Sequence, residues 1–156
     1  MSKPSPRNGI WFPDCGGDPE PGLAGFSGID YRDSVEAKNQ ATVRDFIQKV
    51  WNGQDPVAVD QAIDALVDSS YKRHYEAKVL QGRENLKTCV RTMHKGHTGF
   101  YVTLLRMVHS YNLVGTSIHI RWFEGRVFEM RGIEMYRLHN DLIAESWHTT
   151  ERAGQA

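Results

Sequence analysis

The sequence predicts an α+β fold in which three helices pack on one face of a curved sheet, mixed or antiparallel. Apolar residues recur with a helical period up to about residue 95 and with a period of two from Phe100 onward. Helices that precede a run of strands are typical of α+β domains, where the two kinds of element form separate layers. At 156 residues the chain fits one domain with a core and room for a cavity.

The first 33 residues differ from the rest of the chain. They hold five of the six prolines and six of the fourteen glycines, which disfavour both helices and strand ladders. They also carry several large apolar side chains, such as Trp11 and Phe12, which a solvated tail would not expose. We therefore expect residues 1–33 to form an irregular arm docked on the domain or on a partner subunit, as a packing strap or as a lid. Residues 34–156 are expected to form the single domain.

Three amphipathic helices are predicted before the strands. The first spans about 34–51, the second about 55–70 and the third about 83–95. The second has the clearest start, because Asp55 can cap the helix and Pro56 suits its first turn. In each, apolar residues recur three and four positions apart and form one stripe.

Four strands follow, over 100–109, 113–122, 126–138 and 142–151. The last two form a hairpin, because Asn140-Asp141 tolerates the backbone angles of a tight turn. Side chains alternate between the faces of a strand. The last strand therefore has two predicted faces, one with Ile143, Glu145, Trp147, Thr149 and Glu151, the other with Leu142, Ala144, Ser146, His148 and Thr150.

Composition and motifs exclude several classes of function. Nineteen basic and nineteen acidic residues give no net charge, which disfavours nucleic acid or an anionic membrane as a partner. No signal peptide or spanning segment is apparent, and Cys15 and Cys89 form no disulfide framework, so we expect a cytoplasmic protein. Nucleophile motifs, phosphate-binding loops and paired metal ligands are also missing from the sequence. We expect no metal and no cofactor, and acid/base chemistry if the protein is an enzyme.

Three motifs carry a family resemblance: SSYKRH, GRENLK and the hairpin IEMYRLHNDLIAESW. Over about residues 38–151 the chain resembles the nuclear transport factor two-like superfamily, and within it the SnoaL-like polyketide cyclases. The residues at matching places are Tyr71, His74, Gly82, Glu84, Ile143, Glu145, Trp147 and Glu151. The chain departs from the family pattern in having Glu151 where aspartate is usual, and Glu124-Gly125-Arg126 in place of a Pro-Thr-Gly loop.

The resemblance implies a conical half-barrel with an apolar pocket, no cofactor and a homodimer. A desolvated pocket raises the pKa of a carboxylic acid, so Glu151 is a candidate proton donor or acceptor; the alternative is an exposed residue near the C-terminus. His119 and Arg121 share a strand face, where they either stabilise an enolate oxygen or lie on the outer surface. His148 is interpreted as a surface or interface group.

Glu134 has apolar neighbours on its strand face, including Phe128 and Tyr136. A carboxylate in such surroundings is either paired, for example with an arginine of a neighbouring strand, or catalytic. His74 and Tyr71 are predicted to follow the second helix and reach the pocket mouth, with capping of the helix end as the alternative role of His74.

Candidate catalytic and substrate-binding residues follow from these interpretations. The catalytic candidates are Glu151, Glu134, His119 and His74. The substrate-binding candidates are Trp147 as a flat pocket wall, with Arg121, Tyr71, Tyr136 and Phe128.

The predicted function is that of a cofactor-independent cyclase, isomerase or dehydratase acting on a hydrophobic, carbonyl-bearing small molecule of secondary metabolism. One alternative is a non-catalytic module that binds a small molecule or dimerises. Another is water addition of the epoxide hydrolase type, which needs an Asp-Arg-Asp arrangement; the sequence supplies Arg121 without a clear aspartate pair.

Overall fold

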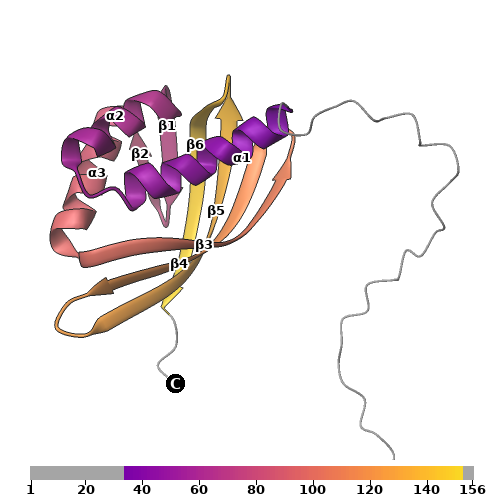
Figure 1. Ribbon diagram of the computed structural model, residues 1–156. Coiled ribbons are helices and arrows are strands. Elements are labelled where there is room, and N and C mark those ends of the chain that lie inside the picture. Colours follow the sequence, from indigo (N-terminus) through magenta and orange to yellow (C-terminus); the bar gives the residue numbers. More distant parts are fainter. Residues whose placement is uncertain (1–33, 153–156) are drawn as a thin grey trace, which may run out of the picture.

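The computed structural model describes residues 34–152, which form three α-helices, one π-helix and a six-stranded sheet (Figure 1). The predicted arm, 1–33, lies outside the described residues. Figure 1 shows α1 lying across the long strands, with α2 and α3 gathered at one end of the sheet. The α+β class, the curved sheet and the layer of helices are as predicted from the sequence. None of the helices in the described part of the chain is long and apolar enough to cross a membrane.

The helices are α1 (Val35–Phe46), η2 (Ile47–Trp51), α2 (Pro56–Leu66) and α3 (Arg83–Gly96). The predicted cap at Asp55 is present, because its carboxylate accepts a hydrogen bond from Val57 N at 3.2 Å. The first helix is capped in the same way by Ser34, whose hydroxyl accepts a hydrogen bond from Ala37 N at 3.1 Å. The first predicted helix is divided, because its last five residues adopt the wider π-helical turn of η2. The third begins and ends within a residue of its predicted limits.

The second helix is shorter than predicted. It ends at Leu66, and the chain continues directly as β1 (Val67–Tyr75), which pairs with β2 (Lys78–Gln81). The expectation that helix extends to about residue 70 is therefore wrong. Pairing of β1 with two strands of the sheet outweighs the weak local preference of this segment.

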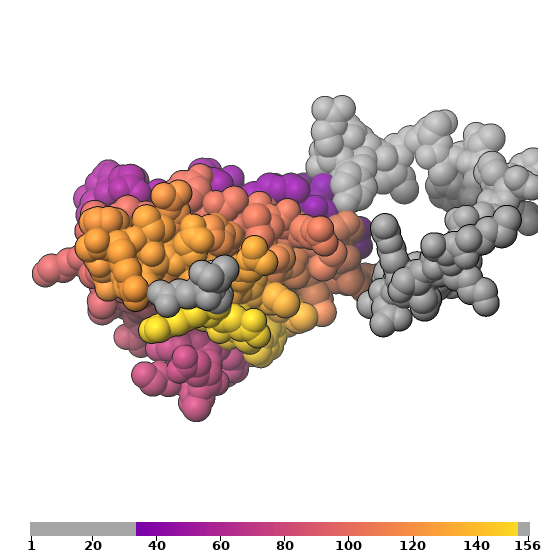
Figure 2. Space-filling model, turned by 90° about the horizontal axis from the view of Figure 1, so that it is seen from below, coloured from indigo at the N-terminus to yellow at the C-terminus, as the bar shows by residue number. Residues whose placement is uncertain are grey.

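The four remaining strands are β3 (Thr98–Ser110), β4 (Leu113–Phe123), β5 (Val127–His139) and β6 (Leu142–Arg152). The order across the sheet is β2-β1-β6-β5-β4-β3. Only β1 and β6 run parallel among these pairs, so the sheet is mixed. At the predicted hairpin turn, Asn140 and Asp141 have φ of 49° and 63°, as a two-residue hairpin turn requires. Figure 2 shows the end of β6 lying between the β5 side and the β1–β2 side of the sheet.

A β-bulge near the start of β6 changes which side chains face the core. Leu138 pairs with Ile143, whereas Arg137 pairs with Glu145, so Ala144 is an extra residue. The predicted strict alternation along β6 is therefore wrong at this point. Ile143 lies on the inner face, but the odd-numbered residues from Glu145 onward point to the outer face.

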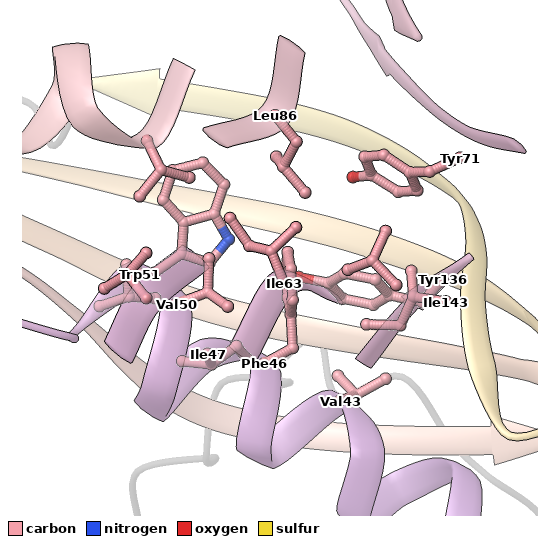
Figure 3. Packing of buried hydrophobic residues seen from close by; sticks show 14 of the residues in the cluster. Val43, Phe46, Ile47, Val50, Trp51, Ile63, Tyr71, Leu86, Tyr136 and Ile143 are labelled. Carbon is pink, nitrogen blue, oxygen red and sulfur yellow. The ribbon is translucent and has the colours of Figure 1, made fainter. Parts of the chain in front are cut away.

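The core lies between the helices and the inner face of the sheet (Figure 3). The Phe46 ring is central to it, with its centroid 6.0 Å from that of Tyr136 and 6.2 Å from that of Trp51. Tyr71 and Ile63 are also fully buried. This packing fixes η2 and the sheet relative to each other, and so fixes the walls of the cavity described next.

Candidate active site

A cavity of about 260 Å³ lies between η2, α3 and the inner face of the sheet. Its walls are mostly apolar, and charged or titratable side chains occupy only part of them, which is typical of small-molecule sites. The lining residues are Trp51, Arg73, Tyr75, Cys89, Met93, Phe100, Val102, Ile118, Ile120, Glu134 and His148.

Three neighbouring strands bring the side chains of Glu134, His148 and Arg73 together. Glu134 on β5 lies directly opposite His148 on β6 in the antiparallel ladder. Arg73 comes from β1, which runs parallel to β6 on its other side. All three side chains reach the same cavity from the inner face.

Glu134 is the centre of this group and is 3% exposed. Its Oε1 accepts hydrogen bonds from His148 Nδ1 at 2.7 Å and from Arg73 Nη2 at 3.3 Å, and its Oε2 accepts one from the Tyr136 hydroxyl. Burial alone would raise the pKa of Glu134, but the bond from His148 and the charge of Arg73 together lower that pKa to about 2. The predicted pairing of Glu134 with an arginine is thus present, and Glu134 is ionised at neutral pH.

The ionised carboxylate defines the tautomer of His148. A carboxylate only accepts hydrogen bonds, so the 2.7 Å contact requires the proton to be on Nδ1. In the neutral imidazole, Nε2 then carries a lone pair and can accept a proton. His148 is therefore arranged as a base whose ring is held by Glu134.

Arg73 and Trp51 form one wall of the cavity. The guanidinium lies over the indole, with Cζ 4.9 Å from the ring centroid. Both residues are buried, at 6% and 5% exposure. Neither Arg73 Nη1 nor Trp51 Nε1 has a hydrogen-bond acceptor among the described residues.

His148 also lines a second hollow of about 420 Å³, which shares Met93, Phe100 and Ile120 with the first cavity. This hollow extends along β6 to Arg152. The imidazole therefore stands where the two spaces meet, within reach of a ligand in either.

Several predicted site residues lie on the outer face of the sheet instead. His74 is part of β1, not a helix cap: its Nε2 lies 2.7 Å from Glu145 Oε1 and its ring stacks on Trp147 at 5.4 Å. Arg137 Nη2 also donates to Glu145, at 3.0 Å. Trp147, predicted as a pocket wall, is 37% exposed and belongs to this outer cluster.

The structure does not bring His119, Arg121 or Glu151 to the cavity. His119 and Arg121 line an outer groove beside β3, and His119 Nε2 is 3.8 Å from Glu129 Oε2. Glu151 is exposed and lies opposite Arg131 in the ladder, so it is not desolvated as the sequence interpretation required.

The predicted aromatic residues are on the inner face but line neither space directly. Tyr71 is buried and its hydroxyl is 2.7 Å from Ser146 Oγ. Tyr136 binds Glu134 through its hydroxyl. Phe128 stacks on Trp122 toward the other end of β5, at 5.4 Å between centroids. The first two support the floor of the site.

Sequence reasoning missed Trp51, Arg73 and His148. The bulge explains His148: an uninterrupted ladder from the hairpin turn would place Trp147 opposite Glu134, and the extra residue replaces it with His148. Arg73 was missed because β1 was not recognised as a strand. The sequence did carry a signal for this strand: Tyr71 and Arg73 are two positions apart, which is the spacing of side chains on one face of a strand, and both are buried.

Comparison with known proteins identifies the fold and the domain type. The family model described as SnoaL-like domain matches residues 43–146. Among curated protein sequences, none matches this chain. A protein from Jannaschia sp. CCS1 named as a SnoaL-like polyketide cyclase is similar in structure, with a TM-score of 0.70 and 13% identity over 77% of this chain and 90% of that one.

Two other solved structures extend the comparison. IdmH from Streptomyces antibioticus, named as a polyketide cyclase, has a TM-score of 0.61 and 18% identity over 72% of this chain and 91% of its own. An LEH-like epoxide hydrolase from M. tuberculosis has a TM-score of 0.62 and 15% identity over 74% and 84%. At these identities the likeness shows the fold and not the reaction.

Proposed function

This chain belongs to the SnoaL-like domain family. We propose that it is a cofactor-independent acid/base enzyme acting on a hydrophobic, carbonyl-bearing small molecule. The reaction class is cyclisation, isomerisation or dehydration. The observation that supports it is the Glu134–His148 pair, with the free imidazole nitrogen beside a largely apolar cavity.

The chemistry begins with transfer of a proton from the carbon next to the substrate carbonyl to His148 Nε2. The C–H electron pair moves into the new C=C bond, and the carbonyl becomes an enolate. Return of the proton at another carbon gives an isomer, loss of a β-hydroxyl as water gives a dehydrated product, and attack of the enolate carbon on a second carbonyl closes a ring. Each outcome needs one positioned base that can also return a proton.

Glu134 acts as a positioning residue. With a pKa of about 2 it is a weak base, and its oxygens are already occupied by donors from three residues. Its role is to hold the imidazole ring and to stabilise the imidazolium formed when Nε2 takes the proton, as the buried aspartate of a Ser-His-Asp triad does for its histidine. Of the predicted catalytic candidates, Glu134 alone is retained in this proposal.

We also propose that the outer face of the sheet forms the interface of a homodimer. Ile133 and Met135 on β5 are 67% and 45% exposed, and Trp147 lies beside them on β6. An exposed apolar patch of neighbouring side chains is typical of an interaction surface.

The proposed reaction is tested without knowledge of the natural substrate. The probe is 1-indanone, a rigid apolar ketone, incubated with the full chain in D₂O near neutral pH while NMR follows loss of the protons on the carbon next to the carbonyl. The wild-type protein is compared with His148→Gln, and His139→Gln, at the exposed hairpin, is the matched control. Exchange that depends on His148 supports the proposal, and exchange at the buffer rate contradicts it.

The alternative of a non-catalytic binding module predicts that 1-indanone binds without faster exchange in the wild-type protein. The alternative of water addition to an epoxide has weaker support. Among the described residues that line the cavity, Glu134 is the one carboxylate, and it is held by three donors, so the Asp-Arg-Asp arrangement has no counterpart there.

A further inference from the structure

We propose that His97 is a second catalytic residue, which donates a proton to the substrate oxygen while His148 removes a proton from carbon. This inference rests on the proposed function and adds an acid to its base. His97 and His148 both line the second hollow, of about 420 Å³. A small molecule that fills this hollow therefore contacts both imidazole rings.

Each ring presents a nitrogen that a ligand can reach. Nε2 of His97 and Nε2 of His148 make no hydrogen bond with residues 34–152, because both rings are bonded through Nδ1. Neither Nε2 is among the buried polar atoms that lack a partner in this part of the chain, so both atoms have accessible surface. The side chains are 28% and 17% exposed, respectively. Both nitrogens are thus available to a ligand in the hollow.

The His97 ring is held at the point where α3 passes into β3 (Figure 1). Its Nδ1 lies 3.0 Å from Met93 O, one turn earlier in the helix. A carbonyl oxygen only accepts hydrogen bonds, so Nδ1 carries a proton and Nε2 is the nitrogen that gains or loses one. The ring also packs edge-on against Trp122, with 5.3 Å between the centroids. The direction of Nε2 is therefore set by the fold.

The charged groups around His97 leave its Nε2 free for a substrate oxygen. Glu124 Oε1 is 3.6 Å from Nε2, which allows an ion pair with the protonated ring but is too long for a hydrogen bond. The same oxygen already accepts a hydrogen bond from Trp122 Nε1 at 3.1 Å. Glu76 and Arg152 also line the hollow, where they are exposed and opposite in charge.

The two rings move one proton through the substrate. His148 Nε2 takes a proton from the carbon next to the carbonyl, and the C–H electron pair forms the C=C bond. The C=O π pair moves to the oxygen, which takes the proton from His97 Nε2. The product is a neutral enol, with His148 now an imidazolium and His97 a neutral imidazole, so the total charge is unchanged. Beside apolar walls a neutral enol costs less than an unpaired enolate.

Binding of a stable enol analogue tests the contact with His97 independently of any reaction. 1-Naphthol carries an enol-like hydroxyl on fused rings, and naphthalene is the same ring system without the oxygen. In the full chain labelled with ¹⁵N-histidine, 1-naphthol should shift the Nε2 resonance of His97, which is identified by its absence in His97→Asn. Naphthalene should shift it less than half as far. An unshifted His97 resonance at saturating 1-naphthol, or no binding of 1-naphthol, would overturn the inference.

Exchange of 1-indanone in D₂O tests the proton transfer itself. His97→Asn keeps a side-chain N–H that can donate to Met93 O but cannot transfer a proton. We expect exchange about 100-fold slower than in the wild-type protein, the lower end of what one positioned acid contributes. His94→Gln is the matched control on the same helix: it keeps an N–H for Trp51 O, to which His94 Nε2 lies at 2.7 Å, and should exchange at the wild-type rate.

Added imidazole separates a catalytic role of His97 from a structural one. In His97→Ala it should restore part of the lost rate beyond its effect in buffer, which replacement of a merely structural side chain would not show. A wild-type rate in His97→Asn would overturn this inference alone. A buffer rate in the wild-type protein would overturn the proposed function as well.

Discussion

Replacing Glu134 by glutamine tests the electrostatics of the site through folding stability. Glu134 has an ordinary pKa of 4.5 and a folded-state pKa of about 2. Because the folded-state value is the lower one, the ionised group stabilises the fold at pH above about 4.5, and this stabilisation is lost as the pH falls through 4.5 toward 2. At about 1.36 kcal/mol per pKa unit, the ionised group contributes about 3 kcal/mol at neutral pH.

The assay is urea unfolding followed by tryptophan fluorescence at several pH values between 7 and 2.5. The wild-type protein should lose stability at up to about 1.4 kcal/mol per pH unit below pH 4.5 from this group. Glu134→Gln should be less stable at pH 7, because Arg73 is left without its counter-charge, and should show a shallower decline in acid. Glu129→Gln, an exposed carboxylate on the same strand, is the control. Identical acid profiles for the wild type and Glu134→Gln would mean that ionised Glu134 does not stabilise the fold.

Two further predictions concern the frame of the site and the outer face. Asn52→Ala should lower the free energy of unfolding by about 2 kcal/mol, because two hydrogen bonds to Val102 are lost, whereas Asn85→Ala, which loses one exposed bond, should change it by less than half as much in the same urea assay. Met135→Glu should convert a dimer into a monomer in light scattering, because it places a charge in the apolar patch with Ile133; a monomeric wild-type protein would contradict the proposed interface.

The layers of helices and sheet could be predicted from the sequence. Which side chains of the last strand face the core could not. Caps, apolar stripes and the Asn140-Asp141 turn act locally, so the helices and the hairpin could be predicted from them. The bulge at Ala144 leaves no comparable local signal, yet it exchanges Trp147 for His148 opposite Glu134. One extra residue thus moved the candidate base from the predicted surface into the cavity.

The contact between Arg73 and Glu134 was the hardest part of the site to predict, because it depends on the pairing of strands that are far apart in the sequence. Arg73 reaches Glu134 because β1 runs parallel to β6, a contact between residues 61 positions apart. The helical spacing of the preceding segment concealed that strand. Glu134 itself could be predicted, because its apolar neighbours already required a partner or a function.

Proton transfer by His148 is measured by the rate of hydrogen–deuterium exchange in 1-indanone with and without the imidazole of that residue. Wild-type protein should accelerate exchange over buffer by at least about 100-fold, the usual effect of a positioned base, and His148→Gln should bring the rate close to that of buffer. His139→Gln should exchange at the wild-type rate. Equal rates for wild type and His148→Gln would show that His148 is not the base, whatever the absolute value of those rates.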